Sequence, residues 1–108
     1  MHTIFIDALH EKKKLKVVFI ALSDNQQRIR TCAPLDYGTL KKVNDMRSKY
    51  QFWDYCDGGS SNPHFVALLP EQILSIELTG ELFEPGDFIH WSIRSNPWQV
   101  SRNWEQYS

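Results

Sequence analysis

The sequence predicts a mainly β protein in which one N-terminal helix precedes a five-stranded barrel and a tryptophan-rich C-terminal extension. A single helical pattern opens the chain, and short apolar runs separated by turn-forming residues follow it. The chain has 108 residues, of which 42% are hydrophobic and 23% charged. This length and composition suit one small globular domain and exclude a disordered or collagen-like protein.

The predicted helix covers residues 3–13. Thr3 can cap its N-terminus, and the lysines at its C-terminal end suit the negative end of the helix dipole. Its apolar side chains have the spacing of one helical face: Ile4, Phe5, Ala8 and Leu9. We therefore expect this face to cap the barrel.

A β-hairpin is expected next. Residues 15–22 are apolar on both faces, which places this strand in the centre of the sheet. A polar turn leads to residues 27–32, whose side chains alternate as in a half-buried strand. Pro34 is expected to end this second strand. Residues 39–48 should then form a helical turn or an ordered loop.

Three further strands are predicted over residues 50–55, 64–69 and 73–78. The glycine-rich segment 57–63 is a turn between the first two, and Pro70 begins a short 3₁₀ turn before the last. One helix followed by five strands, with a tight break between the last two, is the order of Sm-like and SH3-like barrels.

The last part of the chain is too apolar for a free tail. We expect residues 1–85 to form the barrel with its helix, and residues 86–108 to form an extension packed on the barrel or on a second copy of the chain. The second arrangement would make the protein a homo-oligomer. The extension carries large apolar side chains throughout: Phe88, Trp91, Ile93, Trp98, Val100, Trp104 and Tyr107.

Basic residues are concentrated in the first half of the chain. Residues 1–49 hold ten Lys or Arg and five acidic residues. Residues 50–108 hold only two Lys or Arg but eight acidic residues. If these basic residues formed one surface patch, the patch would bind nucleic-acid phosphates without recognising a particular base sequence. The alternative is a solvated face, which the sequence pI of about 6.4 favours. Four basic side chains could share one face of the first hairpin: Lys14, Lys16, Arg28 and Arg30.

A second candidate surface is the aromatic strand. Tyr50, Trp53 and Tyr55 could form a stacking platform for single-stranded bases. The alternative is that Phe52 and one neighbour fill the barrel while the tyrosines line the other side, because so small a barrel needs large side chains inside.

The cysteines and histidines predict no metal site, and no motif predicts a cofactor. Cys32 and Cys56 are not part of a CxxC motif, and the four histidines have no paired spacing. Cys56, Asp54 and His64 lie near one turn and could act as nucleophile, acid and base, but closeness in sequence does not establish hydrogen-bond reach. Segment 58–61 lacks the lysine of a phosphate-binding loop.

The sequence also predicts a cytoplasmic protein with no membrane association and with reduced cysteines. The N-terminus lacks the basic start of a signal peptide. The longest apolar run, residues 17–22, is far shorter than the roughly 20 residues that span a bilayer.

Several segments, in order, resemble the WYL domain, an Sm-like barrel found mostly in bacterial transcriptional regulators. The resemblance covers about residues 3–85 and implies a small barrel that senses a ligand in a regulatory system. The similar segments are residues 4–13, 15–19, 33–35, 50–55, 65–77 and 83–85.

Two departures from the family pattern bear on function. The signature strand reads Tyr50-Gln51-Phe52 in place of Trp-Tyr-Leu. The family's fourth strand carries arginines thought to bind a negatively charged ligand such as a nucleotide or nucleic acid, whereas residues 64–73 hold none. We therefore expect the fold to be kept and the anionic-ligand site to be altered.

The leading prediction is a non-enzymatic, WYL-like regulatory module for ligand sensing or protein interaction, linked to transcriptional regulation. Its partner would be a ligand or another protein. Two alternatives stay open. One is a small barrel that binds nucleic acid through the basic first hairpin, and the other is a small hydrolase that uses Cys56 and His64.

Overall fold

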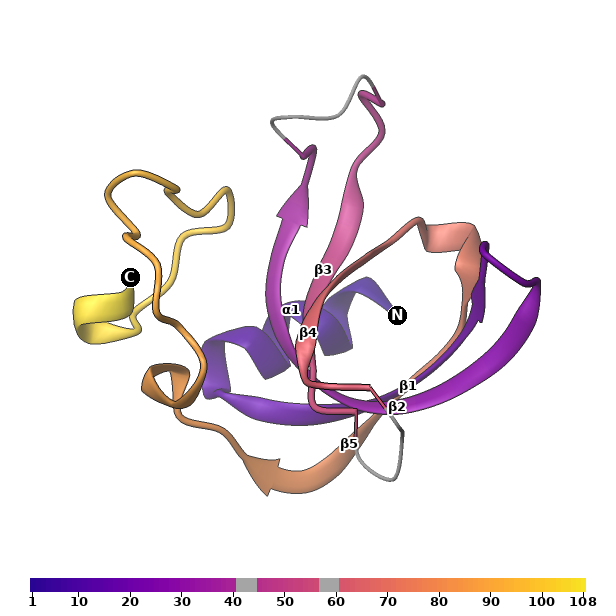
Figure 1. The fold of residues 1–108 in the computed structure, drawn as a ribbon. Coiled ribbons are helices and arrows are strands. Elements are labelled where there is room, and N and C mark those ends of the chain that lie inside the picture. The colour runs from indigo at the N-terminus through magenta and orange to yellow at the C-terminus, as the bar shows by residue number, and fades with distance from the viewer. Residues whose placement is uncertain (41–44, 57–60) are drawn as a thin grey trace.

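The computed structural model describes residues 1–40, 45–56 and 61–108, and it has the predicted architecture (Figure 1). Helix α1 (His2–Glu11) precedes five strands: β1 (Lys13–Ala21), β2 (Gln26–Gly38), β3 (Lys49–Asp54), β4 (His64–Leu68) and β5 (Ile73–Leu82). Three 3₁₀ turns lie in the second half of the described chain: η1 (Pro70–Gln72), η2 (Pro85–Asp87) and η3 (Glu105–Tyr107).

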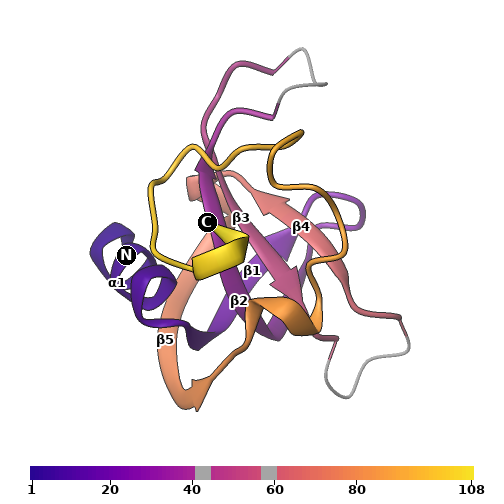
Figure 2. The ribbon, with the colours of Figure 1, turned by 90° about the vertical axis from the view of Figure 1, so that its left-hand side faces the viewer.

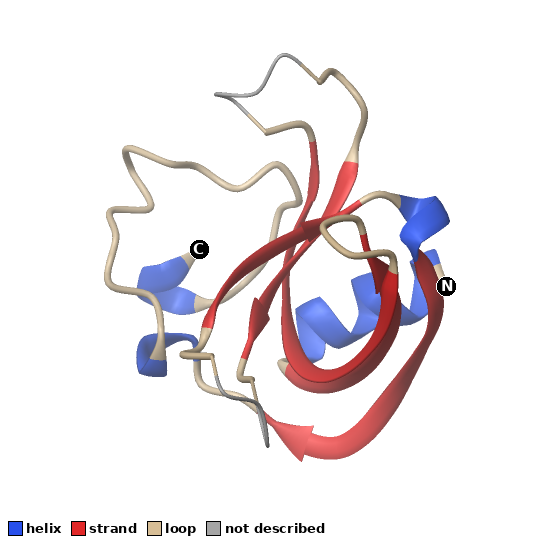
Figure 3. Cartoon of the chain, turned by 45° about the vertical axis from the view of Figure 1, so that its right-hand side comes forward, coloured by secondary structure: helices blue, strands red, loops and turns tan. Residues whose placement is uncertain are grey.

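All neighbouring strands are antiparallel, and their order in the sheet is β4-β3-β2-β1-β5. β1 therefore lies inside the sheet, paired on both sides, and is not an edge strand, in agreement with its apolar sequence. The sheet curls into a small barrel, and α1 packs against β1, β2 and β5 (Figure 3). Within the described residues, no helix is long and apolar enough to cross a membrane.

The apolar face of α1 closes the core, but Ile4, which was predicted to belong to this face, is 41% exposed. Phe5, Ala8 and Leu9 are buried against the strands, and the ring of Phe5 makes edge contacts with aromatic rings of β3. The prediction for Thr3 is wrong, because the helix begins one residue earlier and Met1 occupies the N-cap position without a side-chain hydrogen bond. The helix ends at Glu11, earlier than the predicted residue 13, and the amide of its left-handed C-cap residue, Lys12, donates to the carbonyl of Ala8.

β2 is longer than predicted and continues past Pro34 to Gly38. Pro34 lies opposite Phe52, and the register of β2 with β3 shifts between Pro34 and Asp36. A proline lacks an N–H and is tolerated in a sheet where a bulge interrupts the ladder, so this proline does not end the strand. β5 also extends beyond the predicted residue 78, and its last residue, Leu82, pairs with β1.

Two predicted connections fall partly on residues that are not described. The predicted turn at residues 57–63 includes residues 57–60, and the segment 39–48 includes residues 41–44, both outside the described residues. The predicted 3₁₀ turn at Pro70 is confirmed as η1, where the side chain and amide of Gln72 hydrogen-bond the backbone of Leu69.

The C-terminal segment lies over the barrel on the side of β2 and β3 and returns to α1 (Figure 2). Phe88 stacks on Trp53 of β3, and Trp104 packs edge-on against Phe83 in the core. The indole Nε1 of Trp98 donates a 2.7 Å hydrogen bond to the carbonyl of Tyr107, which folds the segment back on itself. The division of the chain into residues 1–85 and 86–108 stays a prediction.

Candidate functional site

The basic residues predicted to form one patch lie on two faces of the first hairpin. Arg30 lies opposite the buried Val17 in the β1–β2 ladder, and Arg28 shares its face two residues away. Lys16 and Lys14 belong to the opposite face. The expectation of one shared face is therefore wrong, because the lysines and the arginines occupy alternate positions of the pleat.

Acidic side chains pair with most of these cations. Lys14 also lies over the ring of Tyr55, with its Nζ 4.5 Å from the centroid. Lys16 is exposed, and its partner in the β1–β5 ladder is Glu77. The hairpin therefore presents little uncompensated positive charge. Three of the four cations form ion pairs: Arg28 with Asp24, Arg30 with Asp54, and Lys14 with Glu81.

The aromatic residues of β3 do not form one platform. Tyr50 is buried in the core on the same face as Phe52. Trp53 and Tyr55 lie on the other face, where Phe88 covers them with ring centroids at 5.3 Å and 6.2 Å. The buried neighbour of Phe52 is thus Tyr50, and the two tyrosines are on opposite sides of the strand.

A cavity of about 560 Å³ lies between the sheet and the C-terminal segment, and we call it the tryptophan groove. Its volume is in the range of small-molecule sites. Its walls are largely apolar and aromatic, and its described lining residues include no Lys or Arg. They are Leu35, Asp36, Thr39, Leu40, Gln51, Phe65, Trp91, Asn96, Pro97, Trp98 and Gln99.

Asp36 fixes the C-terminal segment against β2 at the base of the groove. Its buried carboxylate accepts hydrogen bonds from the backbone amides of Gln99, at 3.0 Å, and Val100, at 2.9 Å. The side chain of Gln99 donates to the carbonyl of Thr39 at 2.7 Å. A Cβ at Gly38 would lie 2.1 Å from Gln99 Oε1 and would displace this amide, and the φ of +155° at Gly38 also favours glycine.

Arg102 completes the support of the groove. Its fully buried guanidinium lies between the rings of Trp98 and Trp104, 4.0 Å and 4.4 Å from their centroids. It donates to the carbonyl of Val100 at 3.0 Å and lies 3.4 Å from the carboxylate of Asp36. Burial lowers the pKa of Arg102 to about 10, and the charge of Asp36 opposes this shift.

A second cavity of about 560 Å³ lies within the C-terminal segment and shares Pro97 and Trp98 with the tryptophan groove. Arg94 and Arg102 contribute to its lining. The donors of Arg102 are already bonded to backbone carbonyls and to Asp36, so this cavity does not offer that guanidinium to an anionic ligand.

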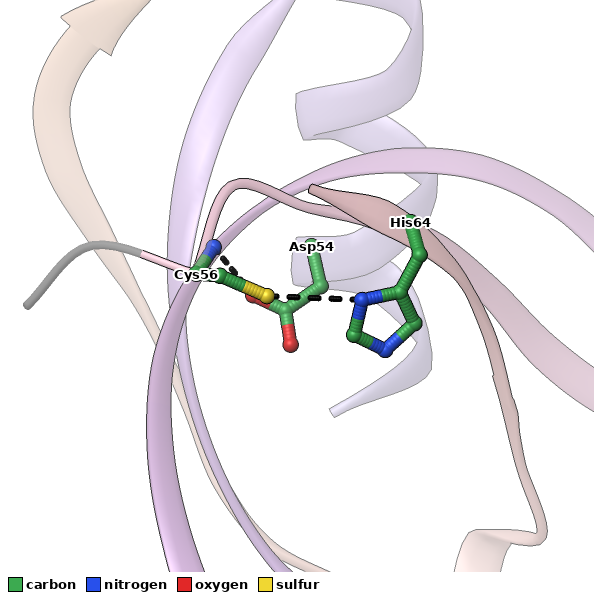
Figure 4. Close-up of side chains that lie close together, drawn as sticks. All are labelled: Asp54, Cys56 and His64. Carbon is green, nitrogen blue, oxygen red and sulfur yellow. Dashed lines mark hydrogen bonds between the residues drawn. The ribbon is translucent and has the colours of Figure 1, made fainter. Parts of the chain in front are cut away.

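Asp54, Cys56 and His64 converge where β3 ends and β4 begins (Figure 4). Cys56 Sγ lies 3.4 Å from His64 Nδ1, so the reach that a Cys/His nucleophile needs is present. Asp54 accepts a 2.8 Å hydrogen bond from the backbone amide of Cys56 rather than orienting the imidazole. Neither of the two cavities described above is lined by Cys56 or His64, so this cluster is not joined to them.

The tryptophan groove could not be predicted from the sequence. Asp36 has the sequence context of a polar turn, and Arg102 is an isolated charge 66 residues away. The available signal was the aromatic content of residues 86–108, which indicated packing but not where Trp91 and Trp98 would lie.

Comparison with known proteins supports the fold. No protein-family model matches the chain, and no curated protein matches its sequence. The structure is similar to that of proteasome accessory factor B/C (PafBC) of Arthrobacter aurescens, with a TM-score of 0.55 and 15% sequence identity. The similarity covers 94% of this chain and 13% of that one, so this chain spans a small part of its structural neighbour. At this identity the two chains are shown to share a fold.

Proposed function

We propose that this chain is a non-enzymatic regulatory module of the WYL type, which senses a small molecule in a system of transcriptional regulation. The sequence resemblance over residues 3–85 supports the family, and the fold shared with PafBC is in keeping with it. The observation that carries the ligand-sensing part is the preformed tryptophan groove, which combines apolar walls with a few converging polar groups.

The lining of the groove favours a flat, uncharged ligand. Trp91, Trp98 and Phe65 supply aromatic surface, and the amides of Gln51 and Asn96 can donate and accept hydrogen bonds. An anionic ligand would meet no basic side chain among the described lining residues, because the guanidinium of Arg102 is buried behind the groove and paired with Asp36. The groove thus differs in charge from the arginine-bearing site that the family resemblance implies.

The two alternative functions receive less support. The basic residues of the first hairpin are divided between two faces and largely paired with acids, which disfavours a phosphate-binding surface. Cys56 and His64 are within hydrogen-bond distance, but neither described cavity includes them, which disfavours a hydrolase.

A fragment screen monitored by NMR tests the proposal. We expect uncharged aromatic fragments to shift the side-chain amide signals of Gln51 and Gln99, and Phe65→Ala to weaken binding by roughly tenfold. Phe65 is 45% exposed, so this variant should fold. Leu74→Ala, which removes a side chain of similar exposure from β5, is the matched control and should bind normally.

Preferential binding of nucleotides over uncharged fragments would contradict the ligand class. If only a protein partner, and no fragment, shifted these signals, the groove would be an interaction surface rather than a small-molecule sensor.

A further inference from the structure

We propose that Asp54, Cys56 and His64 form a binding site for a thiophilic divalent cation of the Zn²⁺ class. The site is separate from the tryptophan groove, and the inference does not rest on the proposed function. The three side chains offer a sulfur, an imidazole nitrogen and a carboxylate oxygen, which are the donor types that Zn²⁺ takes in proteins.

The donor atoms already have spacings close to those of a metal site. All three lie within 4.8 Å of one another. Cys56 Sγ and His64 Nδ1 are 3.4 Å apart. Bonds of the usual length to a tetrahedral zinc ion place such a sulfur and nitrogen ~3.6 Å apart. An ion can therefore bridge this pair with little movement, and a small adjustment of the Asp54 carboxylate completes the set.

The backbone fixes the three ligands from both sides of one connection. Asp54 and His64 lie directly opposite each other in the β3–β4 ladder. The 2.8 Å hydrogen bond from the Cys56 amide to Asp54 Oδ1 holds the cysteine beside this pair. Cys56 also has a left-handed backbone with φ of 54°, which is uncommon for a residue with a side chain. The ladder that forms the barrel therefore also assembles the ligands.

Two of the three proposed ligands are buried, and the third is exposed to solvent. Asp54 is 2% exposed and Cys56 is 5% exposed, whereas His64 is exposed to solvent. The two buried ligands lie in a region of reduced solvent screening, which strengthens their attraction for a cation. Because His64 is exposed, its imidazole can meet a hydrated ion at the surface.

Neighbouring groups supply the outer contacts of such a site. Arg30 Nε lies 3.4 Å from Asp54 Oδ2, so it can orient the carboxylate while Oδ1, with its second lone pair, remains able to bind an ion. The guanidinium also offsets part of the negative charge that a thiolate and a carboxylate bring together. Charged outer partners of this kind are common around protein metal ligands.

The proton balance of binding follows from the contacts of Asn62. Its carbonyl oxygen lies 2.9 Å from His64 Nδ1 and 3.3 Å from Cys56 Sγ, where it accepts the protons that these atoms carry in the ion-free protein. When the ion binds, the imidazole carries its proton on Nε2, the thiol gives one proton to solvent, and the metal–sulfur bond forms. The carbonyl of Asn62 or a water molecule can then take the fourth position.

Titration of the whole chain with Co²⁺ under reducing conditions tests the site. We expect one ion per chain, a sulfur-to-cobalt charge-transfer band in the near ultraviolet, visible bands of tetrahedral intensity, and their loss when Zn²⁺ is added. Cys56→Ser should abolish the charge-transfer band. His64→Gln and Asp54→Asn should raise the dissociation constant by roughly tenfold or more, and circular dichroism should report an unchanged fold.

Two matched variants separate this site from incidental cation binding. His90→Gln removes another exposed histidine, and Cys32→Ala removes the other thiol, and both should retain the full cobalt spectrum. A folded protein without a charge-transfer band would overturn the proposal. So would a band that survives in Cys56→Ser or His64→Gln, or a band lost in Cys32→Ala.

Discussion

The indole Nε1 of Trp104 donates a 2.9 Å hydrogen bond to the backbone carbonyl of Leu9, in the last turn of α1. Carbonyls in the last turn of a helix have no partner within the helix, so the indole satisfies a buried acceptor that would otherwise be unpaired. Trp104 is 1% exposed and packs edge-on against Phe83. The C-terminal segment thus supplies both apolar area and a hydrogen-bond donor to the core.

We therefore expect Trp104→Ala to lower the free energy of unfolding by about 3–5 kcal/mol, since it leaves a large cavity. Trp104→Phe should cost about 1–3 kcal/mol, because it keeps an aromatic ring but leaves the carbonyl of Leu9 unpaired. Urea unfolding followed by circular dichroism measures both. Leu78→Ala, which truncates a 55% exposed side chain, should have little effect. Equal stability of Trp104→Ala and the wild type would contradict this account of the core.

The ion pair between Asp36 and Arg102 should show strong coupling. Either Asp36→Asn or Arg102→Met leaves one buried charge without its partner, and each should destabilise the protein by about 3–5 kcal/mol. The double variant should lose less than the sum of the two, with a coupling energy of about 1–3 kcal/mol. A double-mutant cycle in guanidinium chloride provides the measurement. Additive losses would show that the two groups act independently.

The carboxyl of Asp45 should titrate at unusually low pH. The side chain and backbone amide of Arg47 donate hydrogen bonds to it and lower the pKa of Asp45 to about 2. A carboxyl with a depressed pKa in the folded state stabilises the protein above its ordinary pKa, and this contribution is lost as the pH falls through about 2. Carbon-13 NMR of the Asp45 carboxyl during an acid titration tests this value.

In the same titration, Arg47→Gln should raise the pKa of Asp45 toward its ordinary value. The return should be incomplete, because Lys49 Nζ remains 3.8 Å from the carboxylate. Arg94→Gln removes a guanidinium that does not contribute to the low pKa of Asp45, and it should leave the titration unchanged. An unchanged pKa in Arg47→Gln would show that Arg47 is not the cause.

Oligonucleotides should bind weakly or not at all through the first hairpin. Its arginines and lysines occupy opposite faces, and acids pair with most of them. Fluorescence anisotropy with single- and double-stranded oligonucleotides, over a salt series, measures this. Tight binding at low salt that Lys14→Ala and Lys16→Ala together abolish would restore the nucleic-acid alternative.

The order of elements could be predicted from the sequence because local patterns determine it. The apolar run of β1 indicated a central strand, and Pro70 marked the 3₁₀ turn before β5. Phe5 and Leu9 identified the buried face of α1. Each of these predictions depends on residues that are neighbours in the chain, where periodicity and turn chemistry are informative.

The candidate sites depend on register and on distant contacts, which the local pattern does not encode. A shift of one residue moves every side chain of a strand to the other face, so the lysines and arginines of the first hairpin could not be assigned from spacing alone. The pairing of Asp54 with His64 follows from the β3–β4 register. Pro34 lies beside a bulge, and a bulge has no reliable signature in a single sequence.

The contact of Trp104 with Leu9 joins residues 95 positions apart, and the bonds of Asp36 to the C-terminal segment span more than 60. Closing such long loops costs chain entropy before any contact repays it, which slows folding in proteins rich in distant contacts. During synthesis the core therefore stays incomplete until Trp104 has left the ribosome. Until then the helix end and the curled sheet have apolar surface open to chaperones and to aggregation.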